Sequence, residues 1–491
     1  MNDKLVLGTM KKTSIFFFIL TLACSLFAQK SSFTDDSRSI EATIQGLEKN
    51  IPELLQKSDV PGMSIALVKN GKFVWTKGFG VKNSEKKEPV TKATIFEAAS
   101  LSKPVVAYAV LKLIDAGRID LDTPLNTYLG NNYDVGDDKR LNFITARRVL
   151  SHTSGFPNWR NRDSKTLPIN FTPGEKFSYS GEGFVYLSRV VEKITGIEFD
   201  KFIEKEVFEP LGMNESSFDW KKEFFETKVF NHDGFGKPQG QNAEKGVNAA
   251  ASMHTTSEDY AKFVIAVMEG RGLKKNTRKL MLSPEVYVDK EKSPEVAWGL
   301  GWGLEVEVAH MGKSFFHWGD NGYNKSFIVA SENSKDAVVF FTNSANGLSF
   351  MKEIVGQAVG GDHPSVEWLD YERYDSPGRQ FLKSVVEDGP ESALTKYRAE
   401  RKKDSAKTIS ERQMNRLGYT LLRAEKFDEA IAVFKQNTED FPESANVWDS
   451  LAEACMKNGD KKSAIKFYKK SFELDQTNKN AEENIKKLSN N

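Results

Sequence analysis

Ser100 and Lys103 stand three residues apart, a spacing that places a hydroxyl and an amine on one face of a helix. Apolar residues at 105, 106, 110, 113 and 114 predict a helix that starts just after Ser100 and ends at Gly117. A helix N-terminus stabilises developing negative charge, and a desolvated lysine can accept the hydroxyl proton. The pair alone also fits a capping serine beside a surface lysine. Other motifs must decide between the two.

Four further segments follow this pair along the chain. They are Leu150–Pro157 (LSHTSGFP), Phe177–Gly181 (FSYSG), Ala249–Met253 (AAASM) and His317–Gly319 (HWG). In this order, the five segments resemble the penicillin-recognising serine hydrolases, in the branch of class C β-lactamases, D-alanyl-D-alanine carboxypeptidases and related esterases. The resemblance spans about residues 40–360.

The resemblance implies a role for each matching residue. Ser100 would be the acylated nucleophile and Lys103 its proton partner. Tyr179 would shuttle a proton, with its phenolate favoured by cationic Lys103. The backbone N–H groups of Ser100 and Asp320 would form the oxyanion hole. His317 would stand at the mouth of the site, orienting a substrate carboxylate or supporting Tyr179. Which of Lys103 and Tyr179 is the general base stays open.

The sequence departs from the family pattern in the implied cleft, at Gly181, Trp318 and His317. Gly181 replaces the Asn of the Y-x-N element and removes a side-chain amide. Trp318 replaces the small hydroxyl residue of K-T-G, beside Gly319, and would narrow the cleft. His317 in place of Lys would make carboxylate recognition weaker and pH-dependent. These departures argue against efficient β-lactam hydrolysis more than against acyl transfer.

The pattern of apolar residues predicts an α+β fold with a sheet drawn from both ends of a helical insertion. A helix is expected at 39–57, followed by strands at 63–68 and 73–79 joined at Asn70-Gly71. Residues 94–291 read mostly as helices and loops, and strands return at 298–308, 325–330 and 337–342. The resemblance implies an antiparallel sheet flanked by helices with an inserted helical subdomain. We expect the hydrolase domain over 29–370.

A repeat of 34 residues follows a helical linker expected at 371–410. The self-similar positions in the two units are Leu417/Leu451, Gly418/Ala452, Leu421/Cys455, Ala430/Ala464, Ile431/Ile465 and Phe434/Tyr468. This period, with Pro442 near a repeat end, resembles tetratricopeptide repeats over 411–491. Helices at 379–400 either supply another unit or dock on the hydrolase domain. Cys455 is expected to be a core residue.

The N-terminus has the pattern of a secretory signal peptide over residues 1–28. Lys11 and Lys12 precede an apolar run that ends at Ala28, and no later stretch approaches 18 apolar residues. We therefore expect a secreted or periplasmic protein without a membrane span. A lipoprotein anchored at Cys24 is the second interpretation.

Composition excludes several function classes. Sixty-nine Lys+Arg against 68 Asp+Glu give a formal charge of +1, which offers no electrostatic case for nucleic acid. Two cysteines exclude a disulfide scaffold, and the six histidines show no zinc-hydrolase spacing. We therefore expect no cofactor and no metal. His152 is expected to hold its own loop.

Together these patterns predict a secreted serine hydrolase that acylates Ser100 with amide or ester substrates, either cell-wall-type D-amino-acid peptides or small esters. One alternative is a catalytically silent peptide-binding protein that keeps the cleft and recruits a partner. Another is a true β-lactamase. The repeats suggest a protein partner or, equally, a stabilising appendage.

Overall fold

The computed structural model describes residues 39–130, 133–161, 164–241, 243, 246–308, 312–404 and 408–489. The predicted signal peptide at 1–28, with Cys24, lies outside the described residues. Within the described ranges, no helix combines the length and the apolar character that crossing a membrane requires.

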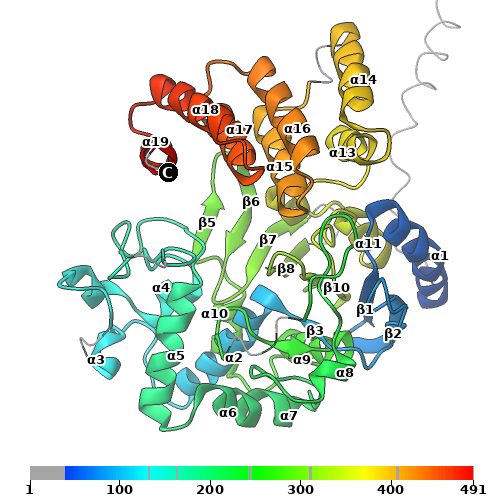
Figure 1. Cartoon of the computed structure of the whole chain (residues 1–491). Helices are drawn as coiled ribbons and strands as arrows, with labels where there is room; N and C mark the ends of the chain where they lie inside the picture. The colour runs from blue at the N-terminus through cyan, green and yellow to red at the C-terminus, as the bar shows by residue number, and fades with distance from the viewer. Residues whose placement is uncertain are drawn as a thin grey trace, which may run out of the picture.

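An eight-stranded antiparallel sheet forms the centre of the molecule (Figure 1). Its order is β2-β1-β10-β9-β8-β7-β6-β5. The strands are β1 Gly62–Lys69, β2 Lys72–Gly80, β5 Val286–Asp289, β6 Ser293–Trp298, β7 Gly303–Val308, β8 Gly312–Asp320, β9 Lys325–Ser331 and β10 Ala337–Thr342. The N-terminal pair β1–β2 joins the later strands through β10, with Met63 opposite Thr342. The predicted α+β fold is confirmed.

The strand predictions are right at the N-terminal hairpin and incomplete further on. Asn70 and Gly71 both have positive φ, as a two-residue hairpin turn requires. The run 298–308 is not one strand, since β6 ends at Trp298 and β7 begins at Gly303 after a turn in which Gly301 has φ +90°. The sequence reading also missed β5 and β8, and β8 contains His317–Gly319.

Each face of the sheet carries its own buried core. Alternate residues along a strand point to opposite faces, so Ile65 packs on one side and Ala66 on the other. Three helices cover the first face, namely α1 Ile40–Ser58, α11 Met351–Ala358 and α12 Pro364–Leu369. On the other face lie α2 Ser102–Asp115 and α9 Ser257–Glu269. The central strands β1, β9 and β10 are buried along almost their whole length and are mainly apolar, because both faces are covered.

A helical block lies between β2 and β5 in sequence and packs beside α2 (Figure 1). It consists of η1 Ala99–Leu101, α3 Asn126–Leu129, η2 Lys139–Phe143, α4 Ala146–Leu150, α5 Glu182–Thr195, α6 Phe199–Ile203, the π-helical η3 Glu204–Phe208, α7 Glu209–Leu211, α8 Phe224–Thr227 and α10 Lys275–Met281. A two-stranded sheet, β3 Phe96–Glu97 with β4 His254–Thr255, borders it. Here β3 leads directly into the Ser100 turn.

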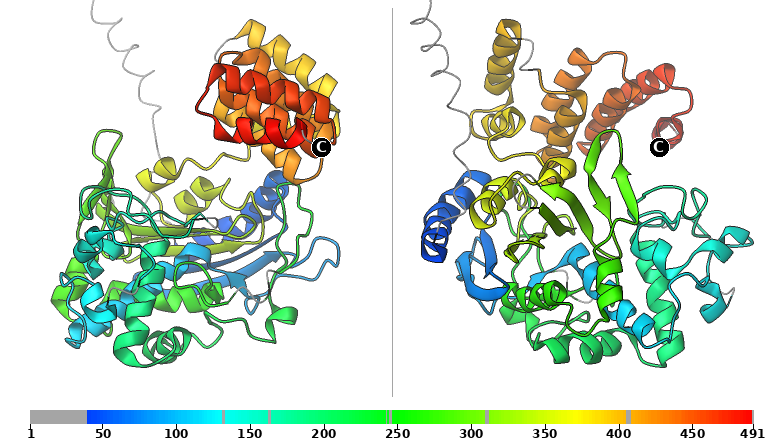
Figure 2. Two further views of the ribbon diagram at one scale, coloured as in Figure 1. Left: turned by 60° about the vertical axis from the view of Figure 1, so that its left-hand side comes forward. Right: turned by 180° about the vertical axis from the view of Figure 1, so that it is seen from behind.

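The C-terminal helices form a separate layer beside the sheet domain (Figure 2). They are α13 Pro377–Glu387, α14 Pro390–Lys403, α15 Glu411–Arg423, α16 Phe427–Asp440, α17 Ala445–Lys457, α18 Lys461–Leu474 and α19 Lys479–Ser489. Helices α13 and α14 share one apolar core with the later helices, and α13 also approaches the hydrolase domain through Arg379. Cys455 lies in this core, where burial raises the pKa of its thiol to about 11. It is the core residue that the sequence predicted.

The helical array contacts the hydrolase domain at the loop around Phe235. The Phe235 ring packs against the core of the array and lies 6.0 Å from Lys426 Nζ. Arg379 Nη2 approaches Asp59 Oδ2 at 3.8 Å.

The domain boundaries at 370/371 and 410/411 stay predictions.

Candidate active site

Ser100 lies in the single 3₁₀ turn η1, directly before α2, and Lys103 lies in the first turn of α2. Lys103 Nζ donates hydrogen bonds to Ser100 Oγ at 3.0 Å and to the carbonyl oxygen of Ala250 at 2.9 Å. The Lys103 side chain is fully buried, and this burial lowers its pKa to about 7. A large fraction of neutral amine is therefore present near neutral pH, in contact with the hydroxyl that it would deprotonate.

The turn that presents Ser100 is strained and tightly held. Ala99 has φ +50°, a left-handed conformation that costs a non-glycine residue about 1 kcal/mol or more. Ser102 Oγ donates to the Ala99 carbonyl at 2.6 Å and accepts from the Met253 N–H at 3.1 Å. The Ala98 N–H donates to the Met253 carbonyl at 2.8 Å. The segment 249–253 therefore fixes both the Ser100 turn and the Lys103 amine.

Strand β8 approaches the same turn through Gly319. A Cβ atom at this position would overlap the Ala98 carbonyl and Ser326 Oγ, so only glycine fits. The close approach places Asp320, the next residue, beside the turn that carries Ser100. This is the arrangement that the predicted pair of backbone donors from Ser100 and Asp320 needs.

Tyr179 lies on the loop before α5, and His152 fixes this loop. Ser180 N–H donates to His152 Nδ1 at 3.0 Å, and Ser178 N–H donates to the His152 carbonyl at 2.8 Å. The His152 ring also packs against the Tyr179 ring at 4.2 Å between centroids. His152 is therefore structural, as predicted, but the loop that its ring holds is the Tyr179 loop rather than its own. Lys103 Nζ lies 4.8 Å from the centroid of the Tyr179 ring.

The expected phenolate at Tyr179 is wrong. Burial raises the pKa of Tyr179 well above the usual value for a phenol, and the neighbouring Ser100 hydroxyl opposes this rise only in part. Burial lowers the pKa of Lys103 and so disfavours its charged form, which was expected to stabilise a Tyr179 phenolate. Tyr179 is therefore a neutral phenol that can donate a proton while Lys103 accepts one.

His317 does not stand at the mouth of the site. Its side chain is 0% exposed, in contact with the rings of Tyr179, Trp298 and Trp318. Its Nδ1–H donates to the Trp318 carbonyl at 2.8 Å. Burial and nearby Lys103 lower the pKa of His317 to about 3, so it is neutral at physiological pH. A buried neutral imidazole cannot recognise a carboxylate by charge, so the expectation that His317 orients a substrate carboxylate is wrong. The other expected role, support of Tyr179, agrees with the ring contact between them.

Two tryptophans line the site. Trp159 is 46% exposed, its indole lies 5.8 Å from Lys103 Nζ, and a Cβ on Gly181 would come within 2.8 Å of its ring. The indole therefore occupies the space next to Gly181, where the family has a side-chain amide. Trp318 is half-buried and packs against the Tyr179 ring at 4.9 Å between centroids. Sequence reasoning named Trp318 and missed Trp159, which follows the Leu150–Pro157 motif by two residues.

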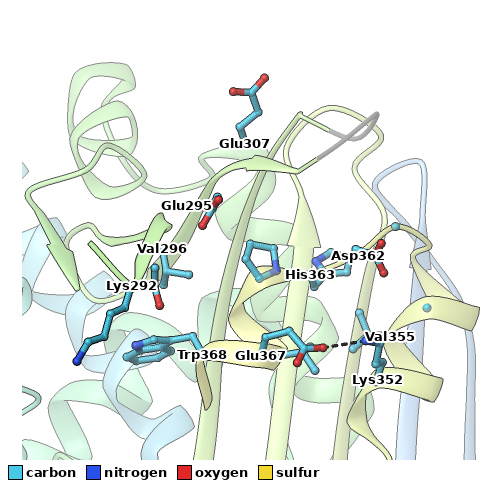
Figure 3. A pocket seen from close by; sticks show the side chains of 15 residues that line it. Lys292, Glu295, Val296, Glu307, Lys352, Val355, Asp362, His363, Glu367 and Trp368 are labelled. Carbon is cyan, nitrogen blue, oxygen red and sulfur yellow. Dashed lines mark hydrogen bonds and ion pairs between the residues drawn. The ribbon is translucent and has the colours of Figure 1, made fainter. Parts of the chain in front are cut away.

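A cavity of about 680 Å³ lies beside α12 and is lined by residues that include Glu295, His363, Glu367 and Trp368 (Figure 3). Its lining residues do not include Ser100, Lys103 or Tyr179. The reacting groups therefore lie outside this cavity.

In the described ranges, no three His, Cys, Asp or Glu side chains are grouped as metal ligands.

Comparison with known proteins agrees with this geometry. The model of the family described as beta-lactamase matches residues 47–356, and the tetratricopeptide repeat model matches residues 445–478. Two solved structures superpose with a TM-score of 0.56. One is the octameric penicillin-binding protein homologue from Pyrococcus abyssi, 25% identical over 70% of this chain and 82% of that one. The other is a class C beta-lactamase, which is 21% identical over 67% of this chain and 99% of that one and is similar in fold.

Curated relatives share parts of the chain. Protein flp of Staphylococcus aureus strain N315 is 31% identical over 193 residues, which are 35% of this chain and 38% of that protein. The chain thus spans well under half the length of that relative. Penicillin-binding protein 4* of Bacillus subtilis strain 168 is 22% identical over 60% of this chain and 71% of that protein.

The family match covers the whole region in which Ser100, Lys103, Tyr179 and Asp320 lie together, from within α1 to within α11. Because it extends over more than half of the residues, this chain belongs to the beta-lactamase family, and it carries a tetratricopeptide repeat near its C-terminal end.

Proposed function

We propose that this protein is a serine hydrolase that transfers an acyl group from a small ester or amide to Ser100 and then to water. One observation carries the proposal. The fully buried Lys103 amine, with a pKa of about 7, donates a hydrogen bond to Ser100 Oγ at 3.0 Å. A structural lysine gains nothing from such burial, whereas a general base needs it.

In the acylation step, neutral Lys103 takes the Ser100 proton as Oγ forms a bond to the substrate carbonyl carbon. The carbonyl oxygen becomes an oxyanion, which the Ser100 and Asp320 backbone N–H groups stabilise. When the tetrahedral intermediate collapses, the bond to the leaving group breaks and that group takes a proton from Tyr179 or Lys103. Neutral Tyr179 suits proton donation because burial raises its pKa.

In the deacylation step, a water molecule attacks the acyl-enzyme carbonyl and gives its proton to the same Lys103/Tyr179 pair. The Ser100–acyl bond breaks, Ser100 recovers its proton, and the carboxylic acid leaves. His317 supports Tyr179 by packing as a neutral ring, and Gly319 keeps β8 close to the Ser100 turn.

The cleft favours substrates that need no carboxylate recognition. A buried neutral His317 and the indole of Trp318 occupy the positions of the family's cation and hydroxyl. The space next to Gly181 is filled by Trp159. We therefore rank small esters above cell-wall-type D-amino-acid peptides, and both above β-lactams.

The remaining proposals concern location and partners. Residues 1–28 would direct export, and a protein partner would bind the repeats. A catalytically silent binding protein is the second candidate, favoured by the departures at Gly181 and Trp318. The hydrogen bond between Lys103 and Ser100 argues against it.

Covalent labelling tests the proposal. The full chain and its Ser100→Ala variant are treated with a fluorophosphonate, a p-nitrophenyl ester and a penicillin, and intact masses are recorded. One fluorophosphonate adduct that is absent in Ser100→Ala, together with ester turnover, supports the proposal. Ser463→Ala is the matched control, because Ser463 and Lys466 have the same spacing on α18. A folded wild type without adduct or turnover would establish the silent binding protein instead.

A further inference from the structure

The segment from His363 to Tyr371 follows the part of the chain that the family model matches, and it is anchored to the sheet by a buried pair. His363 Nδ1 lies 2.7 Å from Glu305 Oε2 on β7, and both side chains are essentially inaccessible to solvent. Ser365 N–H donates to Glu305 Oε1 at 3.1 Å. On the outer side of α12, Glu367 pairs with Lys352 (Figure 3). These contacts fix α12 on β7.

From this anchored position, α12 presents Trp368 to the aromatic wall of the site. The Trp368 ring lies 5.5 Å from that of Trp318 and 6.2 Å from that of Phe177, between centroids. Trp318 in turn packs against Tyr179. The segment after the family domain therefore forms the support behind one side of the cleft.

Tyr371, two residues after α12, reaches the end of β8. Its hydroxyl donates a hydrogen bond to Asp320 Oδ2 at 2.7 Å. The other carboxylate oxygen accepts from the Gly322 N–H at 2.8 Å and pairs with Lys325. Lys325 Nζ also lies 5.6 Å from the centroid of the Tyr371 ring. The Asp320 side chain is thus held by three groups at once.

We propose that Tyr371 is a positioning residue for the oxyanion hole, which holds the Asp320 carboxylate and so keeps the Asp320 backbone N–H directed at the reacting carbonyl oxygen. This inference rests on the proposed function. An oxyanion donor acts by its preorganised position, and a displacement of about 1 Å is enough to weaken it.

The opposite side of the same turn has its own attachment. Asn321 Nδ2 donates to Glu97 Oε2 at 3.0 Å and to the Ala251 carbonyl at 3.3 Å. Loss of the Tyr371 hydroxyl would therefore loosen the turn at Asp320 without detaching it. Burial and the nearby Asp320 charge raise the pKa of Tyr371, so the hydroxyl stays a donor throughout the working range.

Tyr371→Phe tests the proposal because it removes the hydroxyl and keeps the ring beside Lys325. With a p-nitrophenyl ester, we expect kcat to fall about tenfold and KM to change by less than about twofold, since the interaction is realised only in the transition state. The Ki of phenylboronic acid, which forms a tetrahedral adduct, should rise by the same factor. Tyr374→Phe is the control, since no described hydrogen bond joins its hydroxyl to Asp320, and it should match wild type.

A double-mutant cycle separates positioning from a general structural effect. Asp320→Ala keeps the backbone N–H but removes the acceptor of the Tyr371 hydroxyl together with the contacts to Gly322 and Lys325. It should therefore lower kcat at least as much as Tyr371→Phe does, and the double variant should lose no more than Asp320→Ala alone. Unchanged kcat in Tyr371→Phe, or losses that multiply in the double variant, would overturn the inference. If wild type itself shows no turnover and no Ser100 adduct, the proposed function fails and this inference falls with it.

Discussion

The two sides of the candidate active site follow the family pattern to different degrees. On the helical side, Ser100, Lys103 and Tyr179 match the family pattern. Main-chain groups of 249–253 hold Lys103 and the Ser100 turn, and the His152 side chain holds the Tyr179 loop. On the strand side, β8 carries a buried neutral histidine and a tryptophan in place of the family's lysine and hydroxyl residue. Support on that side comes from α12, which lies after the matched region.

This difference suggests that the two sides have separate tasks, proton transfer on the helical side and substrate binding on the strand side. The helical side holds Lys103 and Tyr179, the groups that we propose exchange protons with Ser100, and each has a neighbour within hydrogen-bond or ring-packing distance. The strand side would bind the rest of the substrate, and its surface is aromatic rather than cationic. A family pattern can thus persist for the chemistry while the substrate class changes.

The largest effect is expected on the helical side. Lys103→Met removes the base beside Ser100, and kcat/KM for a p-nitrophenyl ester should fall by about a thousandfold or more. Steady-state hydrolysis measures the loss, and Lys466→Met serves as the control, because Lys466 follows Ser463 at the same spacing on α18. A variant that retains a tenth of wild-type activity would exclude Lys103 as the base.

A smaller effect, on stability, is expected on the strand side. His317→Lys restores the family's residue type but places an ammonium at a position with 0% exposure. We expect a loss of about 3 kcal/mol in the free energy of unfolding, because a buried charge there has no partner. Urea denaturation measures it, with Phe143→Lys, at an exposed position, as the control. A stable, fully folded variant would show that the strand side tolerates the family's cation.

The pH dependence should be about tenfold between pH 6 and pH 8. Because burial lowers the pKa of Lys103 to about 7, kcat/KM should rise with pH through that value as the amine becomes neutral. Initial rates with a neutral ester measure the profile. A profile with no inflection between pH 6 and pH 8 would assign the base to another group.

The lowered pKa of Lys103 should also make the free energy of unfolding depend on pH. A lysine whose folded pKa lies below its unfolded value of about 10.4 binds fewer protons when folded, so its contribution to stability rises with pH between the two values. The free energy of unfolding of wild type should therefore rise relative to Lys103→Met from about pH 7 to about pH 10. A constant difference over this range would contradict the shift.

The smallest effect concerns Gly181. Gly181→Asn should displace the Trp159 indole and lower ester turnover about fivefold, because packing beside Gly181 is lost. Adding Trp159→Ala makes room for the amide and should recover most of that loss. Penicillin acylation rates of the double variant show whether the family's amide brings back β-lactam recognition. Additive losses would show that the two positions are independent.

Sequence alone predicted the helical side because its information is local. The helix after Ser100 follows from a few neighbouring residues, as does the turn at Asn70-Gly71 in the sheet. The strand side depends on contacts between distant segments. Apolar residues of β8 face both cores, so no alternation marks the strand, and the burial of His317 depends on Trp298. Neither Trp159 beside Gly181 nor Tyr371 beside Asp320 follows from spacing.

The pairing of β1 with β10 also determines when the molecule can fold. Because Met63 lies opposite Thr342, a chain emerging from the ribosome cannot complete its central sheet until most of the hydrolase domain has been synthesised. Loop closure over that separation is slow, whereas the C-terminal helices contact their neighbours in sequence and assemble quickly. The hydrolase domain should therefore be the slow-folding part, with unpaired strand edges exposed to chaperones until residue 342 arrives.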